Sequence, residues 1–92
     1  EVVYVEAAGN YSCFKLSDGR QETVTISLGK IEEQLPPDFF FRTGRTYIIN
    51  LNFLKKINSK KGECILHSNA HDFRCEISHD KIRILLDRLN NN

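Results

Sequence analysis

The sequence lacks several features that would assign it to a specialised class of protein. None of its 92 residues belongs to an apolar run approaching the ~20 residues that a membrane-spanning helix needs. Its first residues do not show the order of charged, apolar and small residues that is typical of a secretory signal peptide. The chain has no methionine and starts inside an apolar alternation, EVVYVEA. We therefore expect a fragment of a longer protein whose upstream regulatory region is absent.

The sequence also contains few cysteines and no recognisable catalytic motif. Three cysteines are an odd number without the spacing of a disulfide framework, which favours a reducing, cytoplasmic environment. The three histidines have no neighbours that suggest a nucleophile and its base, and no glycine-rich loop links a strand to a helix. No carboxylates stand out as a catalytic pair. We expect that the protein is not an enzyme and that it uses no cofactor and no small-molecule substrate.

Charge, in contrast, is present and unevenly distributed. Residues 1–38 hold three Lys/Arg against seven Asp/Glu, a charge of −4, whereas residues 39–92 hold ten against five, a charge of +5. The formal net charge of +1 hides this difference. A cationic second half is compatible with a surface that binds a polyanion, although the imbalance alone does not identify one.

Hydrophobic periodicity predicts a chain made mainly of strands. Turn residues such as Gly-Asn and Asp-Gly separate several short apolar runs, and two of the resulting pairs form hairpins. A change to helical spacing marks two short helices, the first ended by a proline pair and the second preceded by a serine. The expected strands are 2–7, 11–16, 22–26, 39–43, 47–51, 64–68 and 72–77, and the expected helices are 27–35 and a C-terminal segment from Ser78.

These elements add up to a mostly-β fold with several small antiparallel sheets, about seven or more strands and one or two short helices. The segment LKKIN at 54–58 stays unassigned. No internal repeat, low-complexity linker or second domain is visible. We therefore expect residues 1–92 to form a single domain.

One motif superficially has the spacing of a zinc site, C-x2-H-x3-H-x3-C. Its members are Cys64, His67, His71 and Cys75. The strands 64–68 and 72–77, however, are expected to pair as a hairpin, in which successive side chains alternate between two faces. Both cysteines then fall on the apolar face and His67 on the opposite one. We expect no metal, and two buried thiols that could face each other across the strands.

Several cations lie beside the most apolar part of the chain. Arg42 and Arg45 flank Thr43-Gly44, where a glycine lets the backbone approach another molecule closely. Lysine and arginine neutralise phosphates, and an arginine fork reads a guanine edge. Arg45 interrupts an apolar run with no acid near it in the sequence, whereas the lysines could equally be solvated turn residues. The other candidate cations are Lys55, Lys56, Lys60, Lys61, Arg74 and Lys81.

The order of the motifs is similar to that of a known family. The first strand ends in Tyr-x-Glu-Ala, and Gly-Asn-Tyr, a hairpin and a short helix follow. The block 40–51, FFRTGRTYIINL, is the most specific part, and a second hairpin ends in Ile-Ser before the last helix. Over essentially the whole chain, this pattern resembles the LytTR DNA-binding domain, the output module of many bacterial response regulators. The resemblance implies a compact all-β DNA binder that uses no recognition helix.

In that family, loops enter successive grooves of double-stranded promoter DNA, commonly as two copies on direct repeats, so a homodimer on DNA is possible. The resemblance implies an upstream receiver or sensor region of a two-component system. Arg45 is the main candidate for base readout, and Arg42, Lys55 and Lys56 are expected to contact phosphates or to support the scaffold. The resemblance implies DNA contacts in three segments: Asn10 with Tyr11, then Gly44, Arg45 and Thr46, and finally Ser78 and His79 with their neighbours Asp80 and Lys81. Asn10, His79 and Lys81 are secondary candidates for base readout.

Two positions depart from the family pattern and bear on sequence preference. Gly44 stands where histidine is usual, and His79 stands where arginine is usual; an imidazole titrates near neutrality. We expect Asn50 to satisfy buried backbone groups rather than to read a base. The alternative function is a protein-interaction or dimerisation module that docks through the phenylalanine-rich segment 39–41 without binding DNA.

Overall fold

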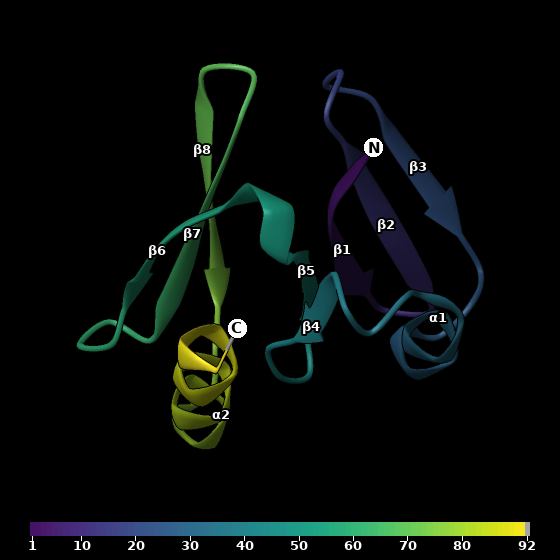
Figure 1. Ribbon diagram of the computed structural model, residues 1–92. Helices are drawn as coiled ribbons and strands as arrows, with labels where there is room; N and C mark the ends of the chain where they lie inside the picture. The colour runs from purple at the N-terminus through teal and green to yellow at the C-terminus, as the bar shows by residue number, and fades with distance from the viewer. Residues whose placement is uncertain (92) are drawn as a thin grey trace.

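The computed structural model describes residues 1–91 and contains two antiparallel sheets. The larger sheet has the strand order β3-β2-β1-β5-β4, and the smaller one has the order β6-β7-β8 (Figure 1). The predicted fold class is confirmed. The strands are β1 (Val2–Ala8), β2 (Tyr11–Leu16), β3 (Gln21–Val24), β4 (Phe40–Arg42), β5 (Tyr47–Asn50), β6 (Leu54–Asn58), β7 (Glu63–Ser68) and β8 (His71–Glu76). The helices are α1 (Leu28–Gln34), the 3-10 turn η1 (Leu51–Phe53), which joins the two sheets, and α2 (His79–Asn90).

The first strand occupies the centre of the larger sheet. β1 pairs antiparallel with β2, which follows it directly, and with β5, which comes some forty residues later. Its alternation places Val3 and Val5 on one face, and both side chains are fully buried. β1 therefore contributes buried side chains to the core and pairs with both β2 and β5.

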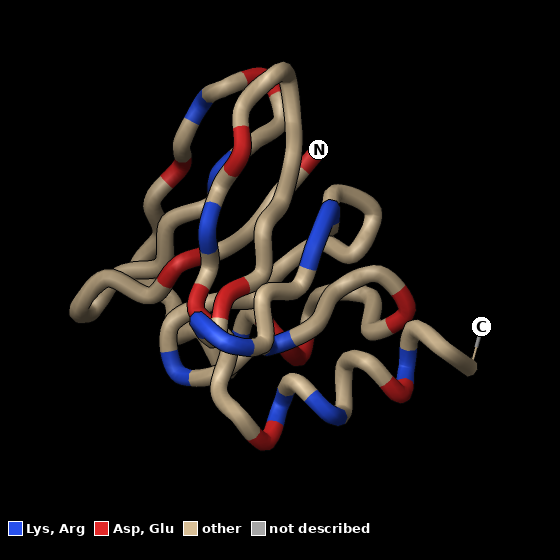
Figure 2. Tube along the Cα trace, turned by 90° about the vertical axis from the view of Figure 1, so that its left-hand side faces the viewer, with Lys and Arg blue, Asp and Glu red and all other residues tan. Residues whose placement is uncertain are grey.

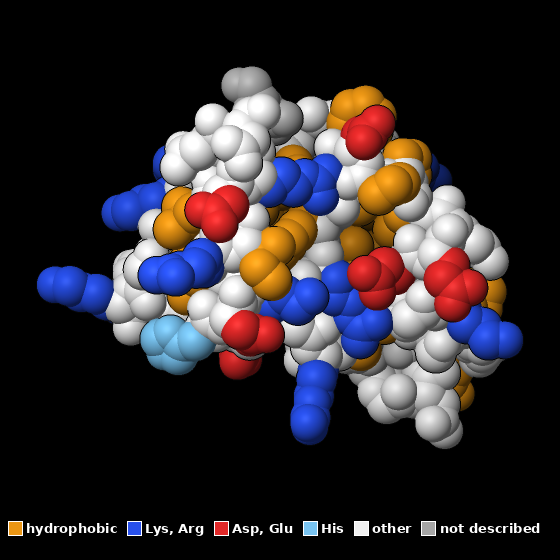
Figure 3. Space-filling model, turned by 60° about the horizontal axis from the view of Figure 1, so that its bottom comes forward, with side chains coloured by type: hydrophobic (Ala, Val, Ile, Leu, Met, Phe, Trp, Pro, Cys, Tyr) orange, Lys and Arg blue, Asp and Glu red, His pale blue; other side chains and the backbone are white. Residues whose placement is uncertain are grey.

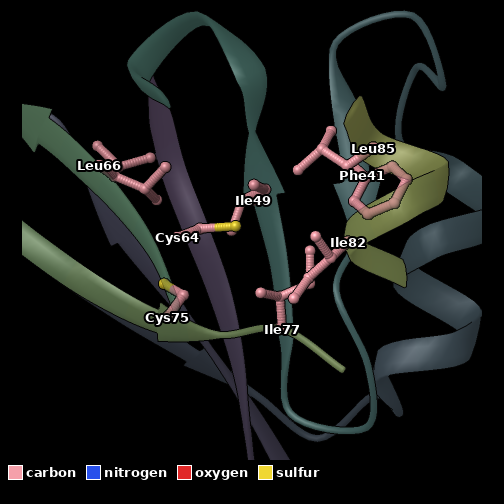
Figure 4. Close-up of a cluster of buried hydrophobic side chains, with 9 residues drawn as sticks. Phe41, Ile49, Cys64, Leu66, Cys75, Ile77, Ile82 and Leu85 are labelled. Carbon is pink, nitrogen blue, oxygen red and sulfur yellow. The ribbon is translucent and has the colours of Figure 1, made fainter. Parts of the chain in front are cut away.

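The main core joins the two sheets to α2. Side chains from both sheets meet Ile82 and Leu85 of α2, which lie on the buried face of that amphipathic helix (Figure 4). The cluster therefore fixes the start of α2 against the ends of β4 and β8. Its buried members are Val3, Phe41, Ile49, Cys64, Leu66, Cys75, Ile77, Ile82 and Leu85.

A second, smaller core lies beneath α1. Leu28 and Ile31 of this helix pack with Val5 and Ile48 of the larger sheet. The Ser27 side chain caps the helix by accepting a hydrogen bond from the backbone N–H of Lys30 at 3.3 Å. The predicted proline stop is confirmed, since the helix ends before the Pro36-Pro37 pair.

The β7–β8 hairpin has the register that the sequence predicts. Cys64 lies opposite Cys75 in the core, while His67 and Asp72 pair on the other face. The turn residues Asn69 and Ala70 have φ values of 55° and 67°, the positive values that a two-residue type I′ turn requires. Within residues 1–91, no group of three or more His, Cys, Asp or Glu side chains gathers as a metal site would require.

The structure differs from the sequence-based prediction in a few local features. LKKIN forms the edge strand β6, and the strand predicted for 22–26 ends at Val24. The predicted role of Asn50 is confirmed: its amide donates to the Val2 carbonyl oxygen at 2.8 Å, and its Oδ1 accepts from the N–H of Asn52 at 2.9 Å. None of the described helices combines the length and apolar character needed to cross a membrane.

Candidate nucleic-acid interface

Three segments that are far apart in the sequence meet at one end of the fold. The N–H of Ala7 donates to the Thr46 carbonyl oxygen at 2.7 Å, which places the end of β1 beside the start of β5. The N–H of Ser78 donates to the Thr43 carbonyl oxygen at 3.0 Å, which brings the end of β8 to the same loop. We call this end the loop face, defined as residues 9–11, 43–46 and 77–81 (Figure 1).

The central loop of this face is held from within the protein. Thr43 is fully buried, and its Oγ1 donates to the Glu76 carbonyl oxygen at 2.7 Å. Its N–H donates to the Tyr47 carbonyl oxygen at 3.0 Å, which closes the loop. A loop fixed at both ends presents its tip with little conformational freedom, so less entropy is lost when the tip binds a partner.

Arg42 serves as an internal strut of this loop. Its Nε donates to the Gly44 carbonyl oxygen at 2.7 Å, and its Nη1 contacts the Glu32 carboxylate of α1 at 3.2 Å. Its side chain is only 25% exposed, so most of the guanidinium is committed to these contacts. Of the two expected roles, phosphate contact or scaffold, this geometry favours scaffold.

Arg45 has the opposite environment. It is exposed at the tip of the loop, and none of the hydrogen bonds or ion pairs among the described side chains involves it. Together with Gly44 it borders a hollow of about 550 Å³, whose other wall contains Lys81 at the start of α2. Lys81 extends its ammonium over the Phe41 ring, 6.0 Å from the centroid, in cation–π geometry. The structure thus brings Arg45 and Lys81 to the same hollow.

The remaining predicted residues of the loop face lie outside the lining of this hollow. Asn10 and Tyr11 are exposed at the β1–β2 turn, where Gly9 adopts a φ of 63°. Thr46 is partly exposed beside Arg45. His79 is exposed but borders a separate hollow on another side of α2, together with Ser59 and Arg83.

Lys55 and Lys56 are not part of the loop face. Lys55 forms an ion pair with Asp72 at 3.1 Å, at the end of β8 that lies away from Ser78. Lys56 is exposed on β6, where it pairs with Ile65 in the middle of the smaller sheet. Asp72, the partner of Lys55, and Ser78 are six residues apart, which corresponds to about 20 Å at ~3.3 Å per residue of strand. A DNA contact by Lys55 or Lys56 would therefore lie outside the loop face.

The loop face contains acids as well as cations. Figure 2 shows acidic residues interspersed with Lys and Arg along α2, and Figure 3 shows side chains of both signs on this side of the molecule. Asp80 in the first turn of α2 borders the hollow with Arg45 and Lys81. The Ser78 side chain next to it lowers the pKa of Asp80, so its carboxyl is ionised at neutral pH. From the sequence, Asp80 was named only as a neighbour of the segment Ser78-His79 that the resemblance implies.

Gly44 has room for a larger residue. A Cβ at this position would lie 4.0 Å from the Ser78 side chain, an ordinary contact distance, and its φ lies outside the left-handed region. The glycine is therefore not required by the backbone, and it leaves the Arg45 tip without a neighbouring side chain at position 44.

Comparison with known proteins identifies the family of this chain. A family model described as the LytTr DNA-binding domain matches residues 1–90. The chain belongs to the LytTR DNA-binding domain family. A solved structure described as the LytTr DNA-binding domain of a methyl-accepting/DNA response regulator from Bacillus cereus superposes with a TM-score of 0.78 at 26% identity. The superposition covers 96% of this LytTR chain and 80% of the solved chain. A search of curated proteins finds no significant match.

Proposed function

We propose that this LytTR domain is the sequence-specific DNA-binding output domain of a bacterial transcriptional regulator of the two-component type. The observation that carries the proposal is Arg45: an exposed arginine at the tip of a loop that buried Thr43 and the strut Arg42 hold rigidly. A preorganised arginine fork can donate two hydrogen bonds to the O6 and N7 atoms of a guanine in the major groove.

The other loop-face residues have complementary roles. Lys81 is positioned to neutralise a phosphate or to donate to a base edge from the opposite wall of the hollow. Asn10 and Tyr11 extend the contact to the groove next to it, from the β1–β2 turn. Gly44 and Thr46 allow the backbone to approach the duplex closely beside Arg45. Lys55, Lys56 and His79 are peripheral contacts, made where the DNA extends beyond the hollow.

The wider context follows the family pattern. We propose a cytoplasmic protein in which residues 1–92 form one DNA-binding unit joined to a receiver or sensor region, with two copies binding direct repeats in a promoter. The proposed partner is double-stranded DNA. The domain would need neither a cofactor nor a small-molecule substrate, since recognition relies on side chains and backbone alone.

The alternative is a protein-interaction module that docks through its phenylalanine-rich segment. Phe41 is buried in the main core and Phe40 packs against the core beneath α1, so only Phe39, which is 49% exposed, remains available for docking. This burial favours DNA binding over the alternative. Salt distinguishes the two functions, because phosphate contacts weaken steeply as salt rises whereas an apolar interface barely responds.

Arg45→Ala tests the proposed function directly. After selection of a cognate site from a random duplex pool, the variant should bind that site about 5- to 150-fold more weakly, the range expected for one bidentate arginine–guanine pair. Arg20→Ala is the matched control, because Arg20 lies in the β2–β3 turn, at the opposite end of β2 from Tyr11, where it pairs with Asp18 at 2.7 Å. Unchanged affinity of Arg45→Ala in a fluorescence-anisotropy titration would contradict the assignment.

A further inference from the structure

The hollow beside Arg45 is lined by two carboxylates, Glu32 and Asp80, and only Glu32 forms an ion pair within the described residues. Glu32 contacts the Arg42 guanidinium at 3.2 Å and so belongs to the strut that supports the loop. Asp80 is exposed on the opposite wall and forms no ion pair with a described Lys, Arg or His side chain. An ionised carboxylate can accept about four hydrogen bonds, so the contact with the Ser78 side chain leaves acceptor positions of Asp80 for a ligand.

A carboxylate on this wall restricts what the hollow can bind. It repels the phosphate backbone, so the part of the DNA that approaches Asp80 has to offer a hydrogen-bond donor. An ionised carboxylate only accepts hydrogen bonds. In the major groove the donors are the exocyclic amino groups of cytosine and adenine, and a carboxylate matches the N4 amino group of cytosine.

We infer that Asp80 is a specificity-determining residue whose carboxylate accepts a hydrogen bond from the amino group of a cytosine, next to a guanine read by Arg45. The inference rests on the proposed function, because it requires the loop face to enter a major groove. Arg45 and Asp80 border one hollow from opposite walls. Together they select a cytosine beside a guanine, and Asp80 disfavours guanine and thymine, whose hydrogen-bonding groups in the major groove are only acceptors.

Asp80 also has a structural role that does not depend on DNA. An acid in the first turn of a helix interacts favourably with the helix dipole, and Asp80 occupies such a position in α2. Removal of the charge would therefore lower stability slightly whichever sequence is bound. A helix-stabilising role alone predicts no change in which base is selected, so base preference is the measurement that separates the two roles.

The test is selection of bound fragments from a random duplex pool with the wild type, Asp80→Asn, Asp80→Ala and Asp87→Asn. Asp87 is the matched control, since it is an exposed acid on the same helix but does not border the hollow of Arg45. We expect the wild type and Asp87→Asn to select a cytosine beside the guanine. Asp80→Asn should shift that position toward adenine, because an amide pairs with adenine N6 and N7, and Asp80→Ala should lose the preference.

Competition titrations should show the preference for cytosine falling about 5- to 150-fold in Asp80→Ala, while affinity for unrelated DNA rises because a negative charge is gone. A wild-type consensus that Asp80→Asn leaves unchanged would overturn this inference alone. A pool that yields no consensus with the wild type would overturn the proposed function as well. Circular dichroism of each variant establishes that it is folded.

Discussion

Replacement of Thr43 with valine should loosen the joint between two segments of the loop face. Valine keeps the shape of threonine but removes the hydroxyl that donates to the Glu76 carbonyl oxygen at 2.7 Å. The side chain is fully buried, so no water can replace the lost donor without rearrangement. An acceptor left without its buried partner costs about 1–2 kcal/mol of the free energy of unfolding, within the range seen for such deletions.

Thr43→Ser is the matched variant, because it keeps the hydroxyl and loses only a methyl group. That loss should cost about 0.8 kcal/mol. Urea unfolding followed by circular dichroism gives the stability of each protein. Fluorescence anisotropy at a temperature where all three proteins are folded then gives the affinity for a selected DNA site.

We expect the serine variant to bind DNA like the wild type, and the valine variant to bind more weakly. In Thr43→Val, residues 44–46 and 77–81 are no longer tied by the side chain at position 43, so ordering them costs entropy on binding. The reasoning would be refuted if valine were tolerated without loss of stability, or if serine weakened DNA binding as much as valine did.

Two further predictions concern the β7–β8 hairpin and the thiols. Ala70→Gly should raise the free energy of unfolding by about 0.5–1 kcal/mol, because alanine at a φ of 67° is strained and glycine is not. Urea unfolding measures this gain, with Ala8→Gly as the control. Absence of a gain in stability would contradict the assigned turn. Burial raises the pKa of Cys64 to about 11 and of Cys75 to about 12, so both thiols should stay protonated and unreactive at pH 8. A chromogenic disulfide reagent should therefore react only with the partly exposed Cys13 until denaturant is added. Three reactive thiols in the native protein would show that the core opens readily.

Most of the strands could be predicted from the sequence because their signals are local. Alternation in 2–7 and 64–68, and turn residues such as Asn69, specify strands and hairpins within about ten residues of chain. The order of strands in the larger sheet could not be read in this way, because the β1–β5 pairing joins distant segments. β6 was missed because two lysines interrupt its apolar residues, leaving no clear alternation.

The candidate site was only partly predictable. The segments around Asn10, Arg45 and Lys81 were found through the family resemblance, and the structure places them at one end of the fold. The strut role of Arg42 depends on Glu32, which lies on another element, and no sequence pattern links the two. Lys55 and Lys81 are both lysines, so the sequence alone does not distinguish them. The structure does, because Lys55 lies far from Ser78 and therefore outside the loop face.

The central position of β1 has a consequence for synthesis of the protein. Val2–Ala8 is translated before the other strands of the domain, and one of its two partners, Tyr47–Asn50, emerges from the ribosome some forty residues later. During that interval β1 and β2 form a hairpin with an unpaired edge, which is the kind of surface that pairs with other chains. Delay in the elongation of residues 17–46 would therefore prolong the stage at which this nascent domain is most prone to aggregate.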